Sequence, residues 1–296
     1  MTKIILIDGT EQTTRLFRQL PLPDGFQIHE GDPSPEKMRM LIADAQVVLN
    51  GHTYMTADDL SHAPLLKQII FLGSGASSYI DLEAAQLRGI RVDTIRGYGD
   101  QTVAQHSIAL ALAALRQIVP MDRAIRDGIW EPLPGREFDE LTFGIVGLGG
   151  IGRATAQLAT ALGFQVIAWN RSEISDPPCP IVSLDEVIER ANILSLHLAL
   201  TPETAGLLDA KAIARMPDQA ILVNTSRAGL VRTDDMLAAL RSGKLAHAAL
   251  DVFDTEPLPA DAHVLDLPNV TVTSHAAYKT EAAARRLVTR ALDLIA

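Results

Sequence analysis

The chain has 296 residues, of which 47% are hydrophobic and 21% are charged, and its net charge is −10 at pH 7. This length accommodates two domains of ordinary size, and the composition is that of a globular protein. The negative charge argues against nonspecific binding to nucleic acid or to an anionic membrane. The single cysteine, Cys179, excludes an intrachain disulfide and a metal site built from several cysteines, so we expect no metal.

The first residues (TKIILIDG) are typical of a strand rather than of a signal peptide, because the apolar run is short and no cleavage pattern follows. No segment approaches the length of a transmembrane helix. We therefore expect a cytoplasmic protein that binds neither nucleic acid nor membrane.

Short apolar segments alternate with helical segments over the first third of the chain. This alternation predicts a mostly parallel sheet covered by helices. The predicted strands are 3–7, 26–30, 47–50, 68–72 and 90–93, and the predicted helices are 12–19, 35–42, 57–61 and 82–88.

The pattern changes near residues 97–100, where a long apolar helix, 102–116, is predicted to lead into a second domain. An apolar strand at 141–146 then runs into GLGGIG, a G-x-G-x-x-G motif, which is followed by a helix at 153–162 and a second strand at 164–169. A glycine motif in this βαβ context indicates a dinucleotide-binding fold.

Each glycine of the motif has a physical task. Gly147 allows the tight turn, Gly149 lets backbone N–H groups approach a pyrophosphate, and Gly152 lets the helix pack closely on the strand. The helix N-terminus adds a partial positive charge. We expect the cofactor pyrophosphate to bind at Gly147, Gly149, Gly150, Ile151 and Gly152.

The end of the second strand indicates which dinucleotide binds. An NAD-binding fold usually has an acidic residue there, which bonds the adenosine ribose. This chain has Asn170, Arg171 and Ser172 instead. Arg171 offers a fork of donors to a 2′-phosphate, and the two neutral residues add hydrogen bonds. We therefore expect NADP(H) to be preferred, with NAD(H) possible.

The alternation resumes after the βαβ unit, with strands predicted at 193–197, 221–224, 246–250 and 270–273, and with helices at 233–242 and 280–295. The last helix is long enough to leave the nucleotide domain. We therefore predict a discontinuous substrate domain, 1–98 plus 279–296, and an inserted nucleotide-binding domain, 99–278. The two chain crossings would form a hinge over a cleft.

Three segments at predicted strand ends contain chemically reactive residues: NTSRAG at 224–229, DVFDTEPLP at 251–259 and SHAAY at 274–278. Residues just beyond the carboxyl ends of parallel strands line the ligand crevice of a doubly wound sheet. Arg227, Glu256 and His275 are therefore predicted to converge, although they are distant in sequence.

These segments, together with GLGGIG and with Leu196-His197 followed by the TPET motif at 201–204, closely resemble the D-isomer-specific 2-hydroxyacid dehydrogenases, and within them the glyoxylate and hydroxypyruvate reductases. The resemblance covers nearly the whole chain. It implies an α/β protein of two Rossmann-like, doubly wound parallel-sheet domains, the first of them flavodoxin-like. It further implies a nicotinamide cofactor in the cleft between the domains, and a homodimer.

The resemblance also implies catalytic roles, and these suit the residue types. His275 donates the proton to the keto oxygen, since imidazole titrates near neutral pH. Glu256 accepts a hydrogen bond from the other ring nitrogen, which fixes the tautomer and favours the protonated ring. Arg227 holds the substrate carboxylate and polarises the carbonyl. The alternatives without catalysis are that His275 is a buried structural histidine and that Arg227 and Glu256 form a structural ion pair.

By the same resemblance, Asp251 bonds the nicotinamide carboxamide, and Thr102 and Thr225 lie near the nicotinamide ring. His197 is expected to be structural or to line the cofactor together with Thr204, and His106 to pack or to face an interface.

The substrate loop is expected to bind the substrate carboxylate through Ser74, Gly75 and Ala76, by backbone N–H groups that need no side chain. Ala76 and Ser78 depart from the Gly and Asp that are frequent in the family, and Tyr278 is expected to cap the pocket. These departures leave the substrate open.

The expected function is transfer of a hydride from NADPH to a small 2-keto acid such as glyoxylate or hydroxypyruvate, giving the D-2-hydroxy acid. One alternative is a D-3-phosphoglycerate dehydrogenase without a regulatory domain, which would need a further cationic pocket. Phosphite oxidation also remains open. An alternative of another class is a non-enzymatic nucleotide-sensing module, which would bind cofactor without turnover.

Overall fold

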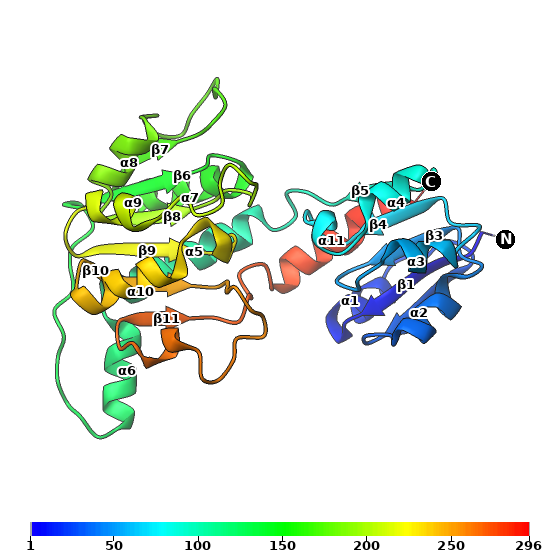
Figure 1. The fold of residues 1–296 in the computed structure, drawn as a ribbon, viewed down its shortest axis with the longest axis horizontal. Helices are drawn as coiled ribbons and strands as arrows, with labels where there is room; N and C mark the ends of the chain where they lie inside the picture. Colours follow the sequence, from blue (N-terminus) through cyan, green and yellow to red (C-terminus); the bar gives the residue numbers. More distant parts are fainter. Residues whose placement is uncertain (1, 296) are drawn as a thin grey trace. The chain divides into compact units, whose positions relative to one another are not determined.

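The computed structural model describes residues 2–295, which form two compact units. Unit 1 extends to Gly99 and resumes at Lys279, and unit 2 is Asp100–Tyr278 (Figure 1). The chain therefore leaves unit 1 after Gly99 and returns to it after Tyr278. Both units are layers of helices on a parallel sheet, and the prediction of an α/β protein with two parallel sheets is confirmed.

Unit 1 contains a five-stranded parallel sheet with the order β2-β1-β3-β4-β5, the flavodoxin-like order of a doubly wound fold. Its strands are buried in the middle of the sheet and become more exposed at its edges. The strands are β1 (Ile4–Gly9), β2 (Phe26–Glu30), β3 (Val47–Asn50), β4 (Gln68–Phe71) and β5 (Arg91–Thr94).

Helices cover this sheet, and their first turns are stabilised by side-chain caps. They are α1 (Glu11–Phe17), α2 (Pro35–Ile42), α3 (Ala57–Ser61), α4 (Leu82–Leu87) and α11 (Glu281–Asp293). Ser34 caps α2, whose first residue is Pro35, a position where proline loses no hydrogen bond. The C-terminal helix α11 packs on α1, where Arg15 lies 2.7 Å from Glu281.

Unit 2 contains a six-stranded parallel sheet with the order β11-β10-β9-β8-β6-β7. The strands are β6 (Thr142–Val146), β7 (Gln165–Trp169), β8 (Ile193–Leu196), β9 (Ala220–Asn224), β10 (Leu245–Leu250) and β11 (Val270–Val272). The chain passes from β7 on one side of β6 to β8 on the other. This reversal makes the carboxyl end of β6 the topological switch point, where ligands of doubly wound folds bind.

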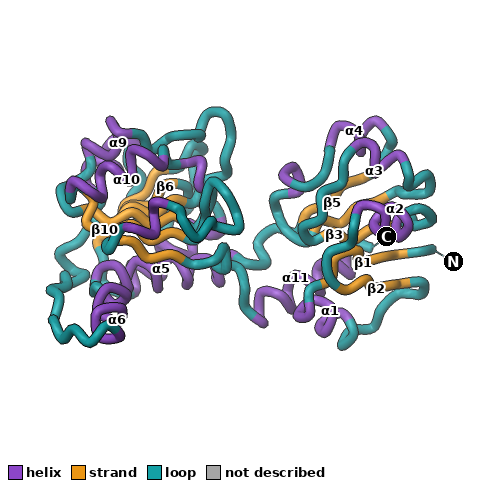
Figure 2. Tube along the Cα trace, turned by 60° about the horizontal axis from the view of Figure 1, so that its bottom comes forward, coloured by secondary structure: helices purple, strands orange, loops and turns teal. Residues whose placement is uncertain are grey.

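Helices pack on both faces of the second sheet. Figure 2 shows α9 (Ala210–Arg215) and α10 (Thr233–Ser242) on one face and α5 (Asp100–Leu115) on the other. Helix α5 is apolar around most of its circumference, which fits its burial against β9, β10 and α7 (Gly150–Ala161). Helix α8 (Leu184–Arg190) completes the layer beside β6 and β7.

Helix α6 (Ile118–Arg126) has an amphipathic sequence but no buried residue. It follows α5 directly after Gln117, whose φ of 53° breaks the helix. The side chains of Ile125 and Trp130 are 56% and 88% exposed. The apolar face of α6 is therefore not buried by the part of the chain that the structure describes.

Within residues 2–295, no helix is both long and apolar enough to cross a membrane.

Candidate active site

The glycine loop lies at the switch point, between β6 and α7. A β-carbon on Gly152 would lie 1.9 Å from the carbonyl oxygen of Gly147, and one on Gly147 would lie 2.5 Å from the carbonyl oxygen of His197. Packing therefore requires both glycines. Gly149, the N-cap of α7, has no atom within 4 Å of its would-be β-carbon. The space above Gly149 is open, as the approach of a pyrophosphate requires.

Asn170 connects the end of β7 to the glycine loop. Its Oδ1 accepts a hydrogen bond from the N–H of Leu148 at 2.9 Å, and its Nδ2 donates one to the carbonyl oxygen of Ser172 at 2.8 Å. Both groups of the amide are thus used to shape the loop around Arg171, which is exposed. The three residues that follow β7, Asn170, Arg171 and Ser172, include no carboxylate that would repel a phosphate.

The turn after β8 lies near Arg171. A hydrogen bond involving Thr201 holds the pKa of Glu203 below its usual range, and the positive charge of Arg171 adds to the effect. Thr204 shapes this turn, because its hydroxyl donates to the carbonyl oxygen of Ala199 at 2.8 Å and accepts from the N–H of Thr201 at 2.8 Å.

His197 is buried at the end of β8. Its Nε2 lies 2.9 Å from Oγ of Ser195, and its Nδ1 has no partner among residues 2–295. Burial lowers the pKa of His197 to about 4. The ring is therefore neutral at pH 7, which fits a structural or cofactor-lining role better than that of a proton donor.

His275 and Glu256 are brought together, with Nδ1 of His275 lying 2.6 Å from Oε2 of Glu256. The other carboxylate oxygen, Oε1, accepts a hydrogen bond from the N–H of Phe253 at 2.9 Å, which fixes its direction. The ring of Tyr278 meets the His275 ring edge-on, at 6.2 Å between centroids. The pair lines a pocket of about 860 Å³. Because Glu256 contacts Nδ1, Nε2 is the ring nitrogen of His275 that Glu256 does not use.

Asp251 holds the turn that carries His275. It is fully buried and accepts hydrogen bonds from the hydroxyl of Thr273 at 2.5 Å and from the N–H groups of Ala276 and Ala277 at 2.9 and 2.8 Å. His106 on α5 contacts the Thr273 hydroxyl at 3.1 Å and lines the same pocket as His275. Sequence reasoning missed Thr273 as a support of this turn.

The loop of Arg227 follows β9, beside the strands that precede Glu256 and His275. Asn224 shapes it, because its Nδ2 donates to the carbonyl oxygen of Arg227 at 2.9 Å and its Oδ1 accepts from the N–H of Ser226 at 3.0 Å. Arg227 is exposed and donates to the carbonyl oxygen of Ser226. Among residues 2–295, no hydrogen bond or ion pair joins Arg227 to His275 or Glu256.

The remaining residues predicted near the nicotinamide also belong to unit 2. Thr102 is buried in the first turn of α5. Thr225, at the end of β9, is buried and lies 2.7 Å from the hydroxyl of Ser107 on α5. These contacts tie the strand end to the helix beneath it.

In unit 1, the predicted substrate loop follows β4. Ser74 is exposed, and Gly75 is the N-cap of a short 3-10 helix that begins at Ala76. The loop after β3 lies beside it, joined through a bridge between Met55 and Ile80. The buried carboxylate of Asp8, which sequence reasoning missed, organises that second loop by accepting the N–H groups of Gly51, His52 and Thr53.

Comparison with known proteins agrees with this geometry. Residues 108–277 match the family described as "D-isomer specific 2-hydroxyacid dehydrogenase, NAD binding domain". The chain is 32% identical to a glycerate dehydrogenase of Methylorubrum extorquens, over 99% of this chain and 95% of that protein. It is 33% identical to a hydroxypyruvate reductase of Blautia hydrogenotrophica, over 87% and 83%.

Among solved structures, the TT0316 protein of Thermus thermophilus superposes with a TM-score of 0.87 at 32% identity, covering 98% of this chain and 94% of that one. The resemblance inferred from the motifs is therefore confirmed. The chain belongs to the D-isomer specific 2-hydroxyacid dehydrogenase family of NAD(P)-dependent oxidoreductases.

Proposed function

We propose that the protein reduces a small 2-keto acid, glyoxylate or hydroxypyruvate, to the D-2-hydroxy acid, with NADPH as the hydride source. The observation that carries the proposal is the 2.6 Å contact between His275 and Glu256, which line a pocket in the same unit as the cofactor loop. The names of two relatives, a glycerate dehydrogenase and a hydroxypyruvate reductase, support the substrate class.

The bound nicotinamide would supply a hydride to the carbonyl carbon of the keto acid. His275 then gives the proton on Nε2 to the carbonyl oxygen, so that the ketone becomes an alcohol. Glu256 holds Nδ1–H and stabilises the positive ring before transfer. Arg227 binds the substrate carboxylate, because its guanidinium fork matches the two oxygens. We assign Ser74, Gly75 and Ala76 to substrate binding as well, and Tyr278 to the pocket wall beside His275.

The residues present fit a dinucleotide. Gly149 leaves open the space that a pyrophosphate needs, and the N-terminus of α7 favours its negative charge. Gly150 and Ile151 form the first turn of that helix. Arg171 at the end of β7 supports the preference for NADPH, and Asn170 and Ser172 shape the loop around it. We assign Thr102, His197, Thr204 and Thr225 to the walls of the cofactor site, and Asp251 to the support of its nicotinamide end.

We also propose a homodimer that uses helix α6. The side chains of Ile118, Ile125, Ile129 and Trp130 are exposed on or just after this helix, and such a patch is typical of an interface. Sedimentation equilibrium should give twice the mass of one chain. A single-chain mass would contradict the proposal.

The test of function follows the loss of reduced-nicotinamide absorbance with NADPH and NADH in parallel. The substrate panel contains glyoxylate, hydroxypyruvate, pyruvate, phenylpyruvate and 3-phosphohydroxypyruvate. We expect turnover of glyoxylate or hydroxypyruvate, with a lower KM for NADPH than for NADH. Fastest turnover of 3-phosphohydroxypyruvate would replace the proposed substrate, and cofactor binding without any turnover would favour a nucleotide-sensing module.

A further inference from the structure

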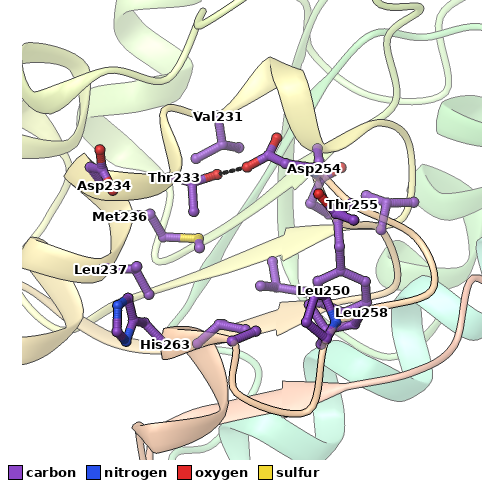
Figure 3. Close-up of a pocket in the computed structure, with 17 residues that line it drawn as sticks. Val231, Thr233, Asp234, Met236, Leu237, Leu250, Asp254, Thr255, Leu258 and His263 are labelled. Atoms are coloured by element: carbon purple, nitrogen blue, oxygen red, sulfur yellow. Dashed lines mark hydrogen bonds between the residues drawn. The ribbon is translucent and has the colours of Figure 1, made fainter.

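Unit 2 contains a second pocket, of about 270 Å³, that includes neither the glycine loop nor His275. Figure 3 shows Met236 and Leu237 of α10 on one side of it and Leu250 and Leu258 on the other. Part of its wall belongs to the hydrophobic core of this unit. The volume exceeds the roughly 150 Å³ of a protein cavity that binds benzene.

The buried part of the lining is apolar except for Asn224, whose polar side-chain atoms already have partners. Asn224 uses its amide for the carbonyl oxygen of Arg227 and its oxygen for the N–H of Ser226. No buried group in the wall therefore requires water. The buried part of such a pocket favours apolar groups, because binding removes apolar surface from water.

The rim is acidic. Asp234 and Asp254 are exposed at the pocket edge, and the hydroxyl of Thr233 donates a hydrogen bond of 2.5 Å to Asp254 (Figure 3). The other titratable side chain in the lining, His263, lies 3.5 Å from Asp266. Two carboxylates repel an anion. The rim thus disfavours anions such as keto acids and nucleotides, and it favours neutral or positively charged compounds.

The pocket is lined by residues of two loops that contain predicted catalytic residues, namely the loop of Arg227 and the loop of Glu256. Phe253 and Leu258 line both this pocket and the pocket of His275, so they form a shared wall. The N–H of Phe253 holds the carboxylate of Glu256, which lies between them in sequence. On another side, Ala228 follows Arg227 directly. A compound that moves this wall would therefore move the partner of His275.

We propose that this pocket is a regulatory site for a small apolar compound, neutral or positively charged and about the size of one aromatic ring. Its occupant acts on catalysis through Phe253 and the orientation of Glu256. The effect on activity rests on the proposed function, whereas binding itself does not.

Three probes of one shape test the binding: phenethylamine, 2-phenylethanol and phenylacetate, which are positive, neutral and negative. Saturation-transfer NMR and calorimetry with the full chain should show binding of the first two, with phenylacetate at least tenfold weaker. Equal binding of phenylacetate, or no binding of any probe, would overturn the proposal.

Two variants locate the site. Ala262→Leu places three more carbon atoms in the lining and should abolish binding, whereas the matched control Ala161→Leu, on the exposed end of α7, should not. Asp234→Asn changes only an exposed side chain, so it should fold normally, and it should reduce the preference for phenethylamine over phenylacetate. Unchanged binding in both variants would place the probes elsewhere.

The regulatory step has a readout that needs no turnover. The ring resonances of His275, identified by their loss in His275→Gln, should shift when 2-phenylethanol binds to the wild type but not to Ala262→Leu. If a keto acid is turned over, kcat should change at least twofold in the same pattern. Binding without a His275 shift would overturn the regulatory role, whereas a shift without any turnover would count against the proposed reaction alone.

Discussion

Asp251 holds the peptide groups that follow His275, a residue whose backbone lies in the left-handed region with φ of 49°. Residues other than glycine rarely adopt this conformation, and it persists only where the surroundings enforce it. The buried carboxylate of Asp251 is such an enforcement, because it accepts from two successive N–H groups and from Thr273. The position of the proposed proton donor therefore depends on a residue that does not touch its ring.

Replacing Asp251 with Asn should disturb this turn. In the wild type, each of these backbone N–H groups donates to a carboxylate oxygen of Asp251. In the variant, the amide NH₂ would face one of them, so one buried donor would lose its acceptor. We expect the free energy of unfolding to fall by about 2–4 kcal/mol and kcat to fall more than KM rises. Urea unfolding and steady-state kinetics measure the two effects. Asp266→Asn, an exposed control, should behave like the wild type.

Replacing Glu256 with Gln should loosen the orientation of the His275 ring, because Nδ1 loses the carboxylate that contacts it at 2.6 Å. We expect kcat to fall about 10- to 100-fold, with a smaller change in KM. Steady-state kinetics measure both constants, with the exposed Glu137→Gln as control. An unchanged kcat would show that the two residues do not interact during the reaction.

The glycines of the cofactor loop allow a matched comparison. Gly149→Ala meets no atom within 4 Å and has an ordinary φ, so unfolding should change by less than about 1 kcal/mol. Its β-carbon occupies the space proposed for the pyrophosphate, so the Kd for cofactor should rise at least tenfold. Gly152→Ala collides with the backbone at Gly147 and should unfold readily. Calorimetric titration and thermal unfolding separate these outcomes, and tight cofactor binding by Gly149→Ala would remove this residue from the site.

Arg171 should decide between the two cofactors. If it binds the 2′-phosphate, Arg171→Ala weakens NADPH binding at least tenfold and leaves NADH within about twofold. Fluorescence titration of both cofactors measures this, and Arg190→Ala, an ion-paired residue on α8, is the control. Equal loss for both cofactors would refute the assignment.

Periodicity and capping made much of the fold predictable. The ranges predicted for β2, β3, α2, α3 and α10 are those observed, because apolar alternation and a Ser or Thr cap or a terminal glycine lie at their ends. Helix α6 was not predicted. None of its residues is buried in the described chain, so its amphipathic pattern does not correspond to packing against a core.

The parts of the candidate site that follow strand ends could be predicted from the sequence. The parts that depend on contacts between distant residues could not. The order of strands places the segments of Glu256 and His275 side by side, and the 2.6 Å contact follows from that neighbourhood. The role of Asp251 depends on N–H groups 25 and 26 positions later. The shared wall of Phe253 and Leu258 depends on how side chains fill volume, which no spacing rule conveys.

Two buried histidines should make the free energy of unfolding depend on pH. Burial lowers the pKa of both His197 and His247 to about 4, from about 6.5, and the positive charge of Arg123 adds to the effect at His247. Between pH 4 and pH 6.5 the unfolded chain binds protons that the folded chain does not. The stability that comes from keeping these rings neutral is therefore complete above about pH 6.5, and it is lost as the pH falls through 4. Each histidine contributes up to about 3 kcal/mol.

The experiment compares urea unfolding of the wild type and of His247→Gln from pH 7.5 to pH 4.5. Since glutamine does not titrate, the variant should lose less stability over this interval, and the difference should grow steadily below pH 6.5. The exposed His62→Asn should follow the wild type. Parallel curves for His247→Gln and the wild type would mean that His247 binds its proton equally in the folded and unfolded chain.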